Sequence, residues 1–161
     1  MLARLQETIP ELFVFLTGPA RGYVTRELER RGVAVRHALL RTRADLGRAY
    51  HALDVSLVAS RQEGGPKMVL ESLAAGVPLV TTRVGQAPEL LADGEDGLLA
   101  DVDDVDSLVA AVARIHADTA LAARLRAAGR LTAEANADER LDGLWATLLD
   151  GFVQKGSPRA D

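Results

Sequence analysis

An α/β fold built on a mainly parallel sheet is predicted by three features of the sequence. Short apolar segments alternate with helical segments of about ten residues, which is typical of βαβ units. The last third of the chain has only the helical pattern, and Ala, Leu and Val dominate the 48% apolar and 4% aromatic composition. The 161 residues fit one domain. We expect residues 1–154 to form that domain and residues 155–161 to be a polar tail.

Each predicted element is an apolar segment with a recognisable period, bounded by Gly, Pro or Asp. Period-two alternation or a short apolar run predicts about five strands, at Leu12–Thr17, Val33–Leu39, Val55–Ala59, Leu79–Val84 and Gly97–Ala100. Helical spacing predicts the intervening helices, at Tyr23–Arg31, Ala44–Leu53, Pro66–Ala75 and Pro88–Ala92. A helical C-terminal cap follows, at Ser107–Ala117, Leu121–Ala135 and Arg140–Val153. The opening segment, Leu2–Ile9, has the pattern of a helix end.

Composition and charge exclude several classes of function. A net charge of −4 gives no general attraction to nucleic acid, and the arginine-rich stretch 21–48 lacks the interleaved aromatic residues of a nucleic-acid surface, because Tyr23 and Tyr50 stand alone. The absence of cysteine excludes disulfides and thiolate chemistry. No apolar run reaches the roughly 18 residues of a membrane span, and the N-terminus is too polar for a signal peptide. We therefore expect a cytoplasmic protein that binds neither nucleic acid nor membrane.

The histidines and the tryptophan have structural interpretations. His37, His51 and His116 share no spacing that indicates a metal site. Trp145 lies at helical spacing from several leucines of the last predicted helix, and this pattern indicates core packing or a docking surface.

Two carboxylates eight positions apart, Glu63 and Glu71, are the main candidates for function. Val55–Ala59 is a predicted buried strand, so the loop that follows it lies at the carboxyl edge of the sheet, where ligands bind in open parallel sheets. Gly64 and Gly65 permit a close backbone approach. Pro66 suits the first position of a helix, whose free N–H groups favour phosphate. The two carboxylates could then bracket a ligand with vicinal hydroxyls, as sugars and riboses have.

A simpler interpretation of the same residues stays open. Glu71 follows Lys67 by four positions and could be a solvated helix charge, while Glu63 could only favour the helix N-terminus as an anion. A glycine-rich turn that leads into a helix is common and is weak evidence alone.

The stretch EGGPKMVLESLAAGVPLV, followed by VGQAPELLADGEDGLLA, resembles the E-x7-E signature region of retaining, nucleotide-sugar-dependent glycosyltransferases of group 1 (GT4-like). The resemblance covers roughly residues 10–150. It implies a Rossmann-like, three-layer α/β/α domain that forms the C-terminal, donor-binding half of a two-domain GT-B architecture. It further implies a hexosyltransferase that uses a nucleotide-diphosphate sugar, with UDP or GDP as the carrier, and needs no metal or other cofactor.

The resemblance assigns roles by position. Glu63 takes the place of the catalytic Glu that contacts the donor sugar near its reacting carbon, and Glu71 that of the Glu that holds the ribose hydroxyls.

The backbone from Gly64 to Met68 would, by the same resemblance, face the diphosphate or the sugar. Its N–H donors would be Gly65, Lys67 and Met68, because proline has none. Leu39 and Leu40 would lie near the nucleobase.

Several departures from the family pattern bear on these assignments. Ser72 and Leu73 stand where the family has Ala-Met, and Gln86 replaces the second Gly of a Gly-Gly pair. The family's first strand of this domain, its diphosphate-binding Arg and Lys, and the acceptor domain have no counterpart before Leu12. We therefore expect a fragment whose sheet closes the resulting gap or borrows a strand, and which binds donor weakly without turnover. The alternative is a non-catalytic nucleotide-sugar binding module or a degenerate partner subunit.

Overall fold

The computed structural model describes residues 1–65 and 67–137. The strands are β1 (Phe13–Thr17), β2 (Ala34–Ala38), β3 (Ser56–Val58), β4 (Leu79–Thr82) and β5 (Leu98–Ala100). The helices are α1 (Leu2–Thr8), α2 (Gly22–Arg30), α3 (Arg43–His51), α4 (Lys67–Ala74), α5 (Ala87–Leu90), α6 (Val105–Ala117) and α7 (Thr119–Ala135). The α/β alternation predicted from the sequence is thus confirmed. The predicted helix Arg140–Val153, with Trp145, and the tail lie outside the described residues.

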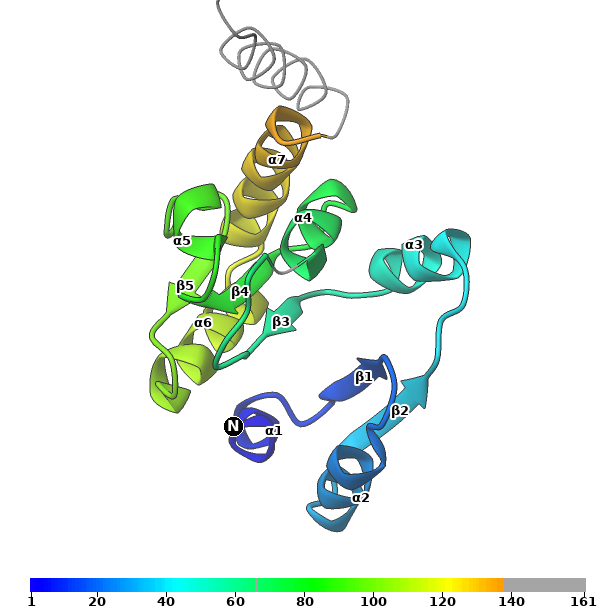
Figure 1. Cartoon of the computed structure of the whole chain (residues 1–161). Coiled ribbons are helices and arrows are strands. Elements are labelled where there is room, and N and C mark those ends of the chain that lie inside the picture. The colour runs from blue at the N-terminus through cyan, green and yellow to red at the C-terminus, as the bar shows by residue number, and fades with distance from the viewer. Residues whose placement is uncertain (66, 138–161) are drawn as a thin grey trace, which may run out of the picture.

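All strand pairings among the described residues are parallel, but the strands form two sheets (Figure 1). One sheet contains β1 and β2, and the other has the order β3-β4-β5. We expected the sheet either to close a gap or to borrow a strand, and among the described residues the gap is not closed, because β1 and β3 are not paired. Between the two sheets lies α1, which precedes β1 in the chain and whose Leu5 and Ile9 are buried in the core cluster with α6.

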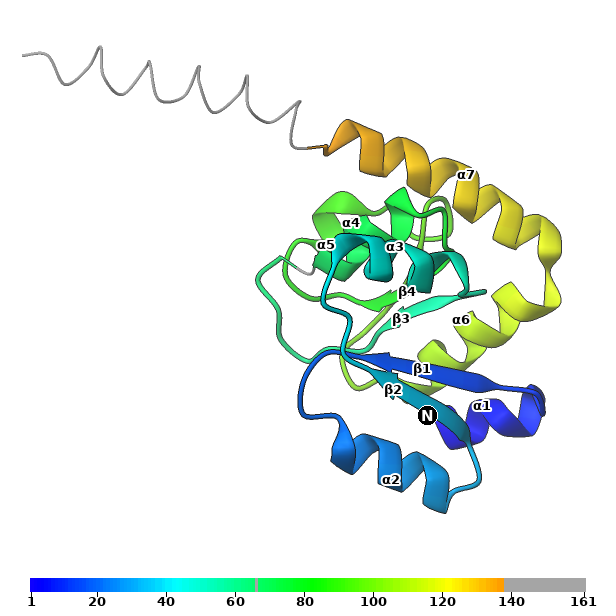
Figure 2. The same cartoon turned by 90° about the vertical axis from the view of Figure 1, so that its right-hand side faces the viewer.

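The core lies on both faces of β4, which is buried along its whole length. Successive side chains of a strand point to opposite faces. Val80 packs in a cluster with α1, α6 and α7, whereas Leu79 packs in a second cluster with Val69 and Leu73 of α4. Helices thus cover the β3-β4-β5 sheet on both sides, with α4 and α6 on opposite faces (Figures 1 and 2). This is the three-layer arrangement that the resemblance implied.

Capping interactions explain where the helices begin and end. Asp104 and Asp118 accept hydrogen bonds from backbone N–H groups three residues later, at 2.9 and 2.8 Å, so α6 and α7 start two residues earlier than predicted. Gly76, with φ of +67°, follows the end of α4 at the predicted stop. No helix within the two described ranges is both long and apolar enough to cross a membrane.

A pH-dependent interaction on α2 gives a local prediction. Arg30 and Arg31 donate hydrogen bonds to Glu27, at 2.7 to 3.1 Å, and lower the pKa of its carboxyl from 4.5 to about 2. A lowered pKa stabilises the fold above pH 4.5, and this stabilisation is lost as the pH falls through about 2. In an NMR titration, Glu27 should titrate near pH 2, and Arg31→Gln should raise its midpoint. Arg26→Gln on the same helix is the control, and a Glu27 midpoint near 4.5 in the unchanged protein would contradict the assignment.

Candidate functional site

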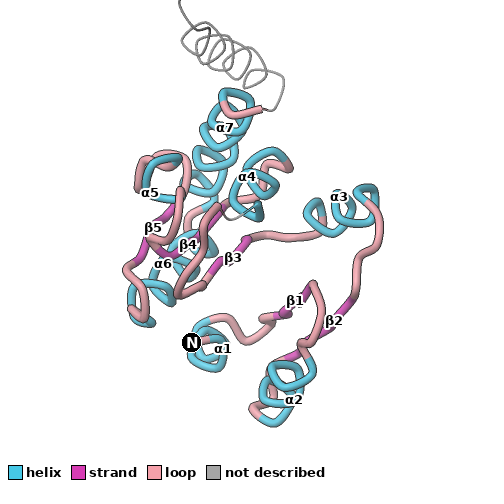
Figure 3. Tube along the Cα trace, viewed as in Figure 1, coloured by secondary structure: helices cyan, strands magenta, loops and turns pink. Residues whose placement is uncertain are grey.

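The candidate site is built on the loop that leaves β3 and leads into α4 (Figure 3). Glu63, Gly64 and Gly65 are all exposed on this loop. Glu63 accepts a hydrogen bond of 2.8 Å from the Ser60 hydroxyl, which restricts its side chain. The predicted position of these residues, at the carboxyl end of a parallel strand and before a helix N-terminus, is the observed one.

The turn after β4 holds this loop in place through backbone contacts. The Gln86 N–H donates to the carbonyl oxygen of Gly64 at 3.1 Å, and the Thr82 hydroxyl donates to that of Ser60 at 2.6 Å. Gly85 has φ of +52°, and a Cβ there would clash with the Gly64 carbonyl oxygen and lie 2.6 Å from that of Glu63. Gln86, which replaces a family glycine, thus contacts the loop through its own backbone.

Glu71 lies on α4 and is only partly exposed. Its neighbours Val69 and Leu73 point into the core and are 0% and 1% exposed. Glu71 Oε2 accepts a hydrogen bond of 3.0 Å from the hydroxyl of Tyr50, at the end of α3. Burial, together with the Glu71 carboxylate, raises the pKa of the Tyr50 phenol. In the described structure Glu71 makes no ion pair with Lys67, and its partner is a buried tyrosine.

Ser72, which departs from the family pattern, joins α4 to β3. It is 0% exposed, and its hydroxyl lies 2.8 Å from that of Ser56 on β3 and 2.5 Å from the Met68 carbonyl oxygen. A buried hydroxyl without a partner would destabilise the fold, and here the partners are present. Together with Tyr50, Ser72 fixes the position of α4 and therefore of Glu71.

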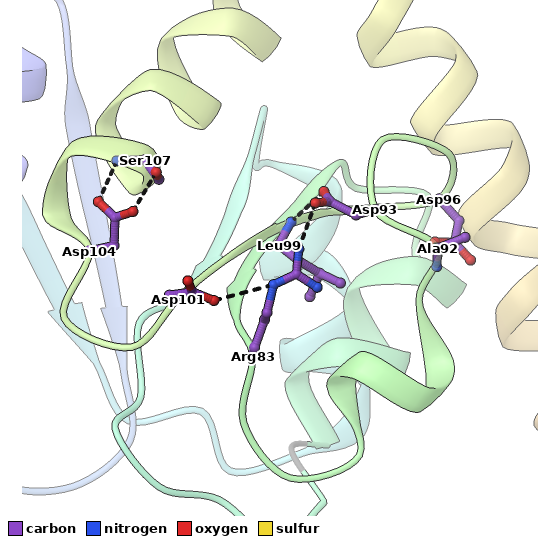
Figure 4. A network of polar contacts seen from close by, with 8 residues as sticks. All are labelled: Arg83, Ala92, Asp93, Asp96, Leu99, Asp101, Asp104 and Ser107. Carbon is purple, nitrogen blue, oxygen red and sulfur yellow. Dashed lines mark hydrogen bonds and ion pairs between the residues drawn. The ribbon is translucent and has the colours of Figure 1, made fainter.

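Arg83 joins the ends of β4 and β5 beside the turn that supports the loop (Figure 4). Its guanidinium group pairs with Asp93 at 2.8 Å and with Asp101 at 3.4 Å. Asp93 also accepts a hydrogen bond of 2.9 Å from the backbone N–H of Leu99. The guanidinium is thus occupied by two carboxylates and anchors the chain just before Gly85.

The other predicted site residues divide into two groups. Lys67 and Met68 form the exposed start of α4, next to the loop. Leu39 and Leu40 follow β2 in the other sheet, and Leu39 is 56% exposed. No hydrogen bond or core cluster among the described residues joins these leucines to the loop or to Glu71, so their place near a nucleobase stays a prediction.

An open pocket of about 370 Å³ lies next to the first residues of this loop. Its lining includes Ala59 and Arg61, which follow β3, and Thr82 at the end of β4, but neither Glu63 nor Glu71. Arg61 pairs with Asp103 at 2.7 Å across this region. Within residues 1–65 and 67–137, no three His, Asp or Glu side chains are grouped so as to hold a metal ion.

Comparison with known families identifies this arrangement. The family described as glycosyl transferases group 1 matches residues 1–118. The chain belongs to this family. Among curated relatives, D-inositol 3-phosphate glycosyltransferase of Mycobacterium marinum is 36% identical over 77 residues, which are 47% of this chain and 16% of that protein. The corresponding enzyme of Corynebacterium diphtheriae is 39% identical over 80 residues, 48% of this chain and 18% of that protein.

Solved glycosyltransferase structures share the fold. Sucrose-phosphate synthase from Thermosynechococcus elongatus superposes with a TM-score of 0.80 at 24% identity, over 97% of this chain and 42% of that chain. HepE from Anabaena in complex with UDP-glucose superposes with a TM-score of 0.79 at 21% identity, over 92% of this chain and 44% of that chain. The chain spans less than half of these structures and under a fifth of the curated relatives above.

These comparisons confirm the family resemblance and the Rossmann-like α/β fold. The roles assigned to individual residues stay predictions. This applies to the residues from Glu63 to Glu71 and to Leu39 and Leu40. The sequence interpretation missed three groups that shape the site, namely Tyr50, Thr82 and Gly85. Each acts through a contact with a segment distant in sequence, and the only sequence signal was the glycine of the Val-Gly-Gln turn.

Proposed function

We propose that this chain binds the nucleotide-diphosphate sugar, linked to UDP or GDP, that serves as donor in a glycosyl transfer. The observation that carries the proposal is the placement of Glu63 and Glu71 on the loop and helix that follow β3, in a chain of the group 1 glycosyl transferases. The bound UDP and UDP-glucose in the HepE structures, which share this fold, support a nucleotide sugar as the ligand.

Each group has a distinct task in this proposal. The Glu71 carboxylate accepts hydrogen bonds from the ribose hydroxyls. The N–H groups of Gly65, Lys67 and Met68, with the positive end of the α4 dipole, face the diphosphate and stabilise the charge that develops on the leaving group. Glu63, held by Ser60, lies nearest the transferred sugar and orients it or stabilises its positive charge. This arrangement gives the diphosphate a positive partner without a metal ion.

The complete reaction is part of the proposal. The hexose would pass to an acceptor with retention of configuration, and a second domain of the GT-B type would bind the acceptor. The chain spans less than half of the solved structures it matches. The 161 residues alone are therefore expected to bind donor weakly and to show no turnover.

Calorimetry with UDP, UDP-glucose and the corresponding GDP compounds tests the two carboxylates separately. Glu71→Ala should weaken binding of the free nucleotide and of the nucleotide sugar by about tenfold, since hydrogen bonds to a charged group are lost. Glu63→Ala should leave binding of the free nucleotide unchanged and weaken only that of the nucleotide sugar. Glu29→Ala, at an exposed position of α2, is the matched control.

Three outcomes would contradict the proposal. Absence of nucleotide binding in the calorimetry of the unchanged protein would refute donor binding. In a separate assay with a donor sugar and acceptors, transfer activity of the 161 residues would refute the dependence on a second domain. Unchanged sugar binding in Glu63→Ala, together with lost binding in Glu71→Ala, would favour a non-catalytic nucleotide-sugar binding module.

A further inference from the structure

Tyr50 is a buried polar residue that the proposed function does not yet use. It lies in the last turn of α3, outside the loop and helix that carry the candidate site, and is 5% exposed. Its hydroxyl donates to Glu71 Oε2 at 3.0 Å. This hydrogen bond joins α3 to α4, which lie side by side in both views (Figures 1 and 2).

The contact makes the two oxygens of the Glu71 carboxylate different, because only one of them has a hydrogen-bond partner among the described residues. Oε2 is fixed by Tyr50, whereas no hydrogen bond among the described residues uses Oε1. A glutamate side chain has three rotatable bonds and loses much rotational freedom when it binds a ligand. A carboxylate already held at one oxygen has lost part of that freedom before the ligand arrives, and such preorganisation strengthens binding.

The tyrosine is suited to this task because it stays a donor. Its buried position and the adjacent carboxylate raise the pKa of the Tyr50 phenol, so the hydroxyl keeps its proton through the neutral and alkaline range. Its ring is held by packing, and therefore the hydroxyl has a defined direction.

We propose that Tyr50 is a positioning residue that fixes the Glu71 carboxylate for recognition of the 2′,3′-diol of a ribonucleotide. Tyr50 does not touch the ligand and acts only through Glu71. The inference rests on the proposed function, in which Glu71 holds the ribose. Its consequence is that Tyr50 controls how well the protein distinguishes ribose from a sugar without the diol.

Binding of UDP and of 2′,3′-dideoxy-UDP to the full 161-residue chain, measured by calorimetry, tests the proposal. GDP and its dideoxy analogue are measured in parallel. The variants are then compared with whichever ribonucleotide, UDP or GDP, binds the unchanged protein more tightly, and with its dideoxy analogue. Tyr50→Phe keeps the ring and removes the hydroxyl, so it should lower affinity for the ribonucleotide by about tenfold and leave that for the dideoxy analogue unchanged. Tyr23→Phe, at a tyrosine that is 74% exposed on α2, should change neither affinity.

A Glu71→Ala background, which leaves no acceptor for the Tyr50 hydroxyl, gives a second measurement. If Tyr50 acts through Glu71, adding Tyr50→Phe to Glu71→Ala should cause little further loss of ribonucleotide affinity. A second full loss would overturn the inference. Equal weakening of both nucleotides by Tyr50→Phe would also overturn it, because that pattern indicates a general structural role.

The remaining outcomes separate this inference from the proposed function. If the unchanged protein prefers the ribonucleotide and Tyr50→Phe keeps that preference, the inference fails while the role of Glu71 survives. If the unchanged protein binds no nucleotide, or binds both forms equally, the ribose role of Glu71 fails and the inference fails with it.

Discussion

Replacing Gly85 with alanine is expected to destabilise the protein by about 3 kcal/mol and to weaken nucleotide binding. Part of the loss is backbone strain, because φ of +52° is unfavourable for alanine. The rest comes from the new Cβ, which meets the carbonyl oxygens of Glu63 and Gly64. These are backbone atoms that cannot rotate aside, so the loop itself must move. Urea unfolding measures the stability, and calorimetry with UDP and GDP measures the binding.

Gly94→Ala separates the two causes. Gly94 also has a positive φ, of +84°, but a Cβ there has open space around it. Its replacement should therefore cost only the strain, about 1 kcal/mol, and leave nucleotide affinity unchanged. If Gly85→Ala and Gly94→Ala lose the same stability and bind nucleotide equally well, the turn after β4 does not hold the Glu63 loop.

The fold was largely predictable because its elements have short-range signals. The strand segments around Phe13, Ala34 and Leu79 alternate or form short apolar runs, and the sequence predicts each to within a few residues. The separation of the strands into two sheets was not predictable from such signals. It depends on which strands come to lie side by side when segments far apart in the sequence pack together, as α1 and α6 do in the core.

The candidate site shows the same division between local and distant signals. Glu63, Glu71 and the glycines between them lie in one continuous motif, so the sequence could place them at the end of β3. Tyr50 lies 21 positions before Glu71, and nothing in its own helix indicates that its hydroxyl faces a carboxylate. Gly85 likewise supports the loop from across the sheet edge. The motif predicts which residues face a ligand, whereas the groups that hold them become visible only when the elements are packed.

A valine at Gly129 should destabilise the protein by about 2 kcal/mol, because this glycine lets α7 approach α4. A Cβ at Gly129 would lie 2.7 Å from Leu73 Cδ2 and 3.2 Å from the Asp96 carbonyl oxygen. Neither group moves easily, since Leu73 is 1% exposed and the Asp96 carboxylate is held by the Thr132 hydroxyl at 2.6 Å. Valine would gain only a few tenths of a kcal/mol in helix propensity over glycine. The loss should appear in urea unfolding.

Gly47→Val is the matched substitution in another helix. Gly47 lies inside α3, and a Cβ there meets no atom within 4 Å. Only the change in helix propensity remains, so stability should be unchanged or rise by a few tenths of a kcal/mol. The difference between the two variants therefore measures the close approach of α7 to α4, free of the intrinsic effect of valine in a helix. If both variants lose the same stability, close packing at Gly129 does not hold α4, and the fixed position of Glu71 depends on the Tyr50 and Ser72 hydrogen bonds.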